Sequence, residues 1–178
     1  MSSDAAHHGI IVGTDGSPGS KVAVDWAARD AFHRGLRLTV VHVVHVLPTE
    51  EAAFWLDVPT PLEYQESWER KARVITAEAV RIAKLATNPQ VEISELTLSG
   101  HTVSTLADLS KDATMIVVGC RGRGAITGRL LGSVSSGLLH HAHCPVAVFH
   151  DECHPHGPVV VGVDGSRASE MAVAIAFD

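Results

Sequence analysis

The chain has 178 residues, of which 46% are hydrophobic and 4% aromatic, and its formal net charge is −6. This length fits one well-packed domain with a short remainder, and the composition favours a Val/Ala/Leu core of the α/β kind. The acidic balance disfavours a general nucleic-acid binder, and no run of about 18 apolar residues predicts a membrane span. The polar start, residues 1–9, does not resemble a secretory signal, and three cysteines suggest a reducing compartment. We therefore expect a cytoplasmic protein that binds neither nucleic acid nor membrane.

Apolar runs alternate with helical stretches along residues 9–150. Short apolar runs bounded by turn residues predict buried strands, and apolar residues at helical spacing predict helices. The strands are expected at 9–14, 36–46, 90–98, 113–118 and 145–149. The helices are expected at 20–34 with Gly35 as C-cap, 62–86, 102–111 and 133–141. This alternation predicts an α/β fold, a five-stranded parallel sheet with helices on both faces in three α/β/α layers.

An internal repeat extends beyond these elements. Residues 12–29 align with residues 161–178, and the polar segment 151–157 between the copies has the composition of a linker. Identical pairs include Gly13/Gly162, Asp15/Asp164, Ser17/Ser166 and Ser20/Ser169. About 20 residues cannot build a core of their own. We expect a complete domain at 1–150 and, at 158–178, the first strand and part of the first helix of a second one.

The segment from Gly119 to Ser133 joins the fourth expected strand to the fourth helix and is rich in glycine and arginine. Glycine lets backbone N–H groups approach an oxyanion, and a helix N-terminus favours negative charge. Arg121, Arg123 and Arg129 add positive charge. The segment therefore predicts a phosphate-binding loop. Its glycine spacing matches neither the P-loop nor the dinucleotide motif, which disfavours a P-loop NTPase and a nicotinamide dehydrogenase.

The spacing Gly119-x2-Gly122-x9-Gly132-Ser133, with Asp15 and the five-strand order, resembles the ATP-binding branch of the universal stress protein family. The resemblance covers about residues 9–150, and the tail is similar to the start of a second such domain, as in tandem mycobacterial members. It implies a Rossmann-like fold of the adenine nucleotide alpha hydrolase type. It also implies bound ATP, with Mg²⁺ held mostly by phosphate oxygens and water, and homodimers through the edge strand 145–149.

The resemblance also implies where the nucleotide binds. Adenine is expected near Gly13, Asp15 and the backbone of Val43, and the ribose against Gly119, where a side chain would obstruct it. The phosphates are expected on Gly122 and on the residues that open the following helix. The complete set of expected binding residues is Gly13, Asp15, Val43, Gly119, Gly122, Arg123, Gly132, Ser133, Val134 and Ser135.

These residues also have ordinary structural interpretations. Asp15 can be the N-cap of the first helix, Gly119 and Gly122 can be turn glycines, and Gly132-Ser133 is a common helix start. Histidines and cysteines are dense between positions 140 and 156, but their spacing fits no standard zinc site, so no metal-ligating residue is expected.

The loop contains no Asp, Glu or His to act on a γ-phosphate, and Asp15 is expected at the adenosine end. We therefore expect no catalytic residue and a nucleotide-dependent sensor or regulator of the stress response with little or no turnover. Two alternatives stay open: a slow ATPase, and a dimerising interaction module that does not depend on a nucleotide.

Overall fold

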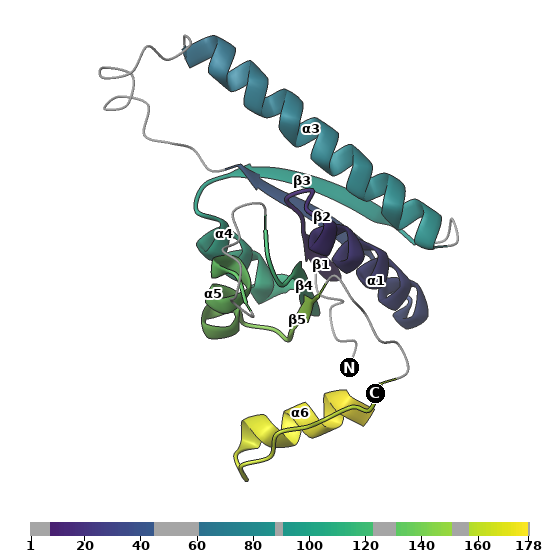
Figure 1. Ribbon diagram of the computed structural model, residues 1–178. Coiled ribbons are helices and arrows are strands. Elements are labelled where there is room, and N and C mark those ends of the chain that lie inside the picture. The colour runs from purple at the N-terminus through teal and green to yellow at the C-terminus, as the bar shows by residue number, and fades with distance from the viewer. Residues whose placement is uncertain (1–7, 45–60, 88–90, 123–130, 151–156, 178) are drawn as a thin grey trace.

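The computed structural model describes residues 8–44, 61–87, 91–122, 131–150 and 157–177 (Figure 1). The strands are β1 (Ile10–Gly13), β2 (Leu38–Val44), β3 (Ile93–Ser99), β4 (Met115–Gly119) and β5 (Val146–Phe149). The helices are α1 (Pro18–Arg34), α3 (Pro61–Ala86), α4 (Thr102–Leu109), α5 (Ser133–His141) and α6 (Arg167–Phe177), with a 3₁₀ turn at Ser110–Asp112. Each strand and helix expected within 9–150 forms within a few residues of its predicted bounds.

The five strands form one parallel sheet in the order β3-β2-β1-β4-β5. The chain adds β2 and β3 on one side of β1 and then crosses to add β4 and β5 on the other. The strand order therefore reverses between β1 and β4. In open parallel sheets, ligands bind outside the carboxyl ends of the strands at such a reversal. No helix in the described ranges is long and apolar enough to span a bilayer.

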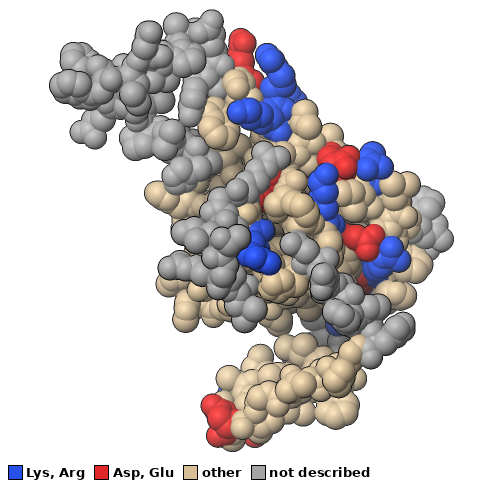
Figure 2. All heavy atoms as spheres, viewed as in Figure 1, with Lys and Arg blue, Asp and Glu red and all other residues tan. Residues whose placement is uncertain are grey.

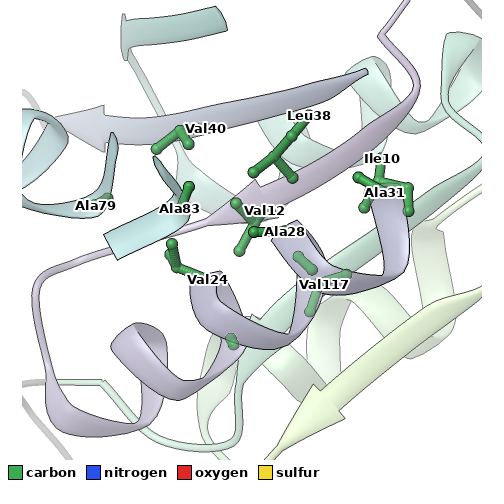
Figure 3. Packing of buried hydrophobic residues seen from close by; sticks show 12 residues of the cluster. Ile10, Val12, Val24, Ala28, Ala31, Leu38, Val40, Ala79, Ala83 and Val117 are labelled. Carbon is green, nitrogen blue, oxygen red and sulfur yellow. The ribbon is translucent and has the colours of Figure 1, made fainter. Parts of the chain in front are cut away.

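Helices cover both faces of the sheet, which confirms the three-layer prediction. Helices α1 and α3 lie on one face, and α4 and α5 lie on the other (Figure 1). Figure 3 shows Val12 of β1 and Val40 of β2 meeting Val24 and Ala28 of α1 and Ala83 of α3. The alanines let the two helices lie close to the sheet, so α1 comes directly beside the end of β4.

Helix α1 has well-defined ends. Ser17 is its N-cap, because its Oγ accepts the N–H of Ser20 at 3.3 Å, and Pro18 follows in the first turn. The C-cap is Gly35 in the left-handed region at φ 63°, as predicted. The N-cap interpretation of Asp15 is wrong. Asp15 Oδ1 instead accepts the N–H of Ser17 at 3.0 Å and fixes the turn that precedes the helix.

The C-terminal copy of the repeat forms the same turn. Asp164 Oδ1 accepts the N–H of Ser166 at 2.9 Å, and Ser166 Oγ accepts the N–H of Ser169 at 3.2 Å. Gly165 has φ 79°, against 78° for Gly16 in the first copy. The hydrogen bonds from the hydroxyl and N–H of Ser166 lower the pKa of Asp164. The repeat seen in the sequence is thus also a structural repeat at this turn.

The strand predicted at 158–163 is absent from the described structure, so this part of the prediction is wrong. Val159 and Val160 are 73% and 89% exposed, whereas their counterparts Ile10 and Ile11 in β1 are fully buried. A strand forms only where a neighbouring strand completes its hydrogen bonds. Helix α6 does form and lies apart from the sheet (Figure 1). The C-terminal segment 157–177 that contains it shows mostly uncharged residues on the face drawn in Figure 2. Residues 151–156 of the expected linker lie outside the described residues.

Candidate functional site

A pocket of about 580 Å³ lies at the carboxyl ends of β1, β2 and β4, where the strand order reverses. Apart from Arg123, which lies outside the described residues, every residue expected to bind the nucleotide lines this pocket. They are Gly13, Asp15, Val43, Gly119, Gly122, Gly132, Ser133, Val134 and Ser135. Residues separated by up to 122 positions in the sequence are therefore brought into one site by the parallel topology.

The carboxyl group of Asp15 faces the glycine-rich loop. A Cβ placed on Gly122 would lie 2.7 Å from Asp15 Oδ2. The carboxyl group of Asp15 therefore lies beside Gly122, one of the residues on which the phosphates are expected. Lys71 and Arg121 also line the pocket, so the described lining carries both signs of charge.

The N-terminus of α5 opens into the pocket. Gly132 is the N-cap, so Gly132-Ser133 is indeed a helix start. The N–H groups of Ser133, Val134 and Ser135 occupy the first turn, where the helix offers no acceptor of its own. Three peptide N–H groups and the positive end of the helix thus point to one place, which is the usual arrangement for binding an anion.

The hydroxyl of Ser135 has a structural task. It is buried, donates to the Cys120 carbonyl at 3.0 Å and accepts the N–H of Gly132 at 3.1 Å. The Gly132 N–H also lies 2.6 Å from the Cys120 carbonyl oxygen. These bonds tie the end of β4 to the start of α5. A phosphate contact from Ser135 therefore has to come from its N–H, whereas the Ser133 side chain is exposed.

Gly119 lines the pocket, but a side chain at this position would point towards the backbone of α1. A Cβ at this position would lie 2.7 Å from the Gly19 carbonyl carbon and 2.8 Å from the Ser20 nitrogen, both in the backbone of α1. The close approach of α1 is thus a reason for glycine at this position that is independent of the expected ribose contact. Glycine at 119 allows the first turn of α1 to pack against the end of β4.

Val43 presents its backbone to the pocket. The last bond between β1 and β2 runs from the Thr14 N–H to the Val41 carbonyl at 2.9 Å, whereas the Val44 carbonyl accepts from Gly100 on the β3 side. Because alternate residues of a strand direct their peptide groups to opposite neighbours, Val43 directs its N–H and C=O towards β1. Strand β1 has already ended there, so both groups face the pocket.

Comparison with known proteins identifies the family. A family model described as "Universal stress protein family" matches residues 7–150. The chain belongs to the universal stress protein family. A universal stress protein of Mycobacterium tuberculosis is 52% identical over 186 residues, and one of Mycobacterium bovis is 45% identical over 190 residues. Both alignments include 100% of this chain, which spans 61% of the length of each relative.

Solved universal stress proteins share the fold. A crystal structure of a universal stress protein in complex with cAMP has a TM-score of 0.62 at 28% identity and covers 83% of this chain and 99% of that one. A universal stress protein from Archaeoglobus fulgidus in complex with dAMP has a TM-score of 0.60 at 22% identity and covers 82% of this chain and 99% of that one. These matches confirm the predicted Rossmann-like architecture.

Some lining residues of this universal stress protein were not expected from its sequence. Trp68 and Lys71 reach the pocket from α3, with the Lys71 ammonium 5.2 Å from the Trp68 ring centroid. The sequence pattern of α3 contains no signal that distinguishes Trp68 and Lys71 from the other residues of this helix. His42 also lines the pocket, and here the sequence carried a signal, because His42 is a polar residue in the middle of the valine run of β2.

Proposed function

We propose that this chain binds ATP together with Mg²⁺ and acts in the cytoplasm as a nucleotide-dependent regulator of the stress response, with little or no turnover. One observation carries the proposal. One pocket extends from the backbone N–H and C=O of Val43 in β2 to the N-terminus of α5, so it can hold a base at one end and phosphates at the other. The cAMP and dAMP complexes of the structural neighbours support an adenine nucleotide.

The base end fits adenine by its hydrogen-bonding pattern. Val43 offers one N–H donor and one C=O acceptor to the pocket. The Watson–Crick edge of adenine carries the complementary pair, the acceptor N1 beside the N6 amino donor. Guanine carries the reverse pair. In the same position its donor would face the Val43 N–H and its acceptor would face the Val43 C=O, so neither hydrogen bond would form. Main-chain recognition at Val43 therefore favours adenine.

The phosphate end combines backbone donors with positive charge. The N–H groups of Ser133 and Val134 at the start of α5 and the Arg121 side chain would meet the phosphates. Mg²⁺ would neutralise phosphate charge and would be held largely by phosphate oxygens and water. Among the described lining residues, Asp15 supplies a carboxylate, which lies against Gly122 and would face the ion or its bound water.

Calorimetry with Mg-ATP tests the proposal. We expect saturable 1:1 binding to the full chain. Removing Mg²⁺ with a chelator should weaken it, because the phosphates then carry unneutralised charge towards Asp15. No heat of binding at millimolar Mg-ATP would refute the proposal.

A slow ATPase is the second candidate, and the position of Asp15 against the loop is the observation that favours it. Phosphate release in the same samples separates the two candidates, with Asp15→Asn as the matched variant. Release that is equal in both proteins and at background level supports a binding role. Steady release that the substitution abolishes would establish turnover.

We further propose that the chain forms homodimers through β5, which is an edge strand of the sheet. The N–H groups of Ile116 in β4 and of Cys120, the residue after β4, donate to the carbonyls of Pro145 and Phe149, so Val148 of β5 directs its peptide N–H outward. An outward row of unpaired peptide groups can pair with a second copy.

Light scattering tests this dimer. We expect a dimer mass for the wild type and for Val148→Ala, and a monomer mass for Val148→Pro. Both variants remove the branched valine side chain, but only proline removes the outward N–H. A proline variant that stays dimeric would place the interface elsewhere.

The proposed domain organisation has a complete domain at 1–150, a linker at 151–157 and the opening of a second domain of the same fold at 158–178. The repeated turn at Asp164, Ser166 and Ser169 supports it. So does the greater length of the mycobacterial relatives.

A further inference from the structure

The ladder between β1 and β2 ends in an unusual way beside the pocket. Pairing stops at Gly13 opposite Val41, and the Thr14 N–H makes the last bond. In a regular parallel ladder, the next bond would run from the Val43 N–H to the Thr14 carbonyl. Among the described residues this bond is not made. The Thr14 carbonyl oxygen lies instead 2.7 Å from Nδ1 of His42.

This contact fixes the hydrogen on the imidazole ring. A carbonyl oxygen only accepts hydrogen bonds, so Nδ1 of His42 has to carry the hydrogen. The Nδ1–H group thereby takes the place of the missing backbone donor. The Thr14 carbonyl, which is part-buried and needs a partner, is satisfied without drawing in the Val43 peptide.

We propose that His42 is a positioning residue for the base. By occupying the Thr14 carbonyl, it keeps the Val43 N–H available to a ligand whose edge carries an acceptor beside a donor, as adenine does. Without the imidazole donor, the Val43 N–H would close onto the Thr14 carbonyl and complete the regular ladder. The base would then lose its donor, and the preference for adenine over guanine would fall. This inference rests on the proposed function for its ligand, but the behaviour of the Val43 peptide can be measured in the free protein.

Two substitutions at position 42 separate the hydrogen bond from the bulk of the side chain. Leucine removes the donor, whereas asparagine carries an amide N–H close to the position of Nδ1. In amide hydrogen exchange of the free protein, we expect the Val43 N–H to exchange more slowly in His42→Leu than in the wild type, because it gains the Thr14 carbonyl as a partner. It should exchange at the wild-type rate in His42→Asn. His141→Leu, at an exposed histidine outside the pocket, is the control.

Calorimetry with ATP and GTP measures the consequence for binding. We expect His42→Leu to bind ATP about tenfold more weakly, the effect of one hydrogen bond, with a smaller ratio of ATP to GTP affinity. His42→Asn and His141→Leu should keep the wild-type ratio. A leucine variant with unchanged Val43 exchange and unchanged base preference would overturn the inference. Failure of the wild type to bind ATP would refute the proposed function, and the exchange experiment would still decide the role of His42.

The wild-type protein provides a test that needs no variant. Nitrogen NMR of the His42 ring should show the hydrogen on Nδ1 in the neutral imidazole. The Nε2–H tautomer would overturn the inference, even if His42→Leu does not fold.

Discussion

Gly119→Ala is expected to lower the free energy of unfolding by about 3 kcal/mol, the upper end of the range for overpacked positions. The added methyl group would lie 2.7 Å and 2.8 Å from backbone atoms of Gly19 and Ser20. Backbone atoms cannot rotate away as the end of a side chain can, so the first turn of α1 has to move off β4. Urea unfolding followed by circular dichroism measures the loss. A reduced nucleotide affinity in this variant would follow from displaced structure and would not by itself locate the ribose.

Gly122→Ala is the matched control, because it makes the same change a few residues further along the same segment. Its methyl group would meet the Asp15 carboxyl group, which can turn to another rotamer. We expect a stability change below about 1 kcal/mol, typical of sites outside the core, together with weaker Mg-ATP binding. Equal losses of stability in the two variants would contradict the assignment of Gly119 to helix packing.

Leu138→Ala is expected to destabilise the chain by about 2–5 kcal/mol. Leu138 is fully buried in α5 and belongs to the core cluster formed with Ile11, Ile116 and Leu106 beneath α4 and α5. Truncation leaves a cavity under the helix whose N-terminus lines the pocket. Thermal unfolding should show a lower Tm, by roughly 2–4 °C for each kcal/mol in a chain of this size.

The neighbouring Leu139 provides the control for this change. It is 53% exposed on the same helix, so Leu139→Ala removes the same atoms without opening a cavity. We expect its stability to stay within about 0.5 kcal/mol of the wild type. A large loss in Leu139→Ala would mean that α5 packs through a different face from the one described.

Periodicity and turn residues were sufficient to predict the fold, because each element of the first domain has its own local pattern. Helix α1 begins at Pro18, directly after its N-cap Ser17, and ends before its C-cap Gly35, and both signals depend on residues within one turn. The strand expected at 158–163 shows the limit of such reasoning. The sequence Val159–Val163 resembles that of β1, but pairing comes from other strands, and residue patterns within the segment do not state whether those strands are present.

Residues close together in sequence could be assigned to one place, but the directions of their side chains could not. Gly119, Gly122 and Gly132 line the same pocket, which their short separation in the sequence made foreseeable. The direction of an absent Cβ depends on how two elements cross, so the packing of Gly119 on α1 was not foreseeable. Lys71 is a similar case, because α3 reaches the pocket only through its packing over β2.

The repeated turn bears on how such chains lengthen during evolution. Asp164, Gly165, Ser166 and Ser169 keep their hydrogen bonds and backbone angle although the described residues 157–177 contain no strand. All its partners lie within six residues, so a copied gene segment brings the whole motif with it. A repeated copy of this segment can therefore form its turn and helix start independently of a sheet.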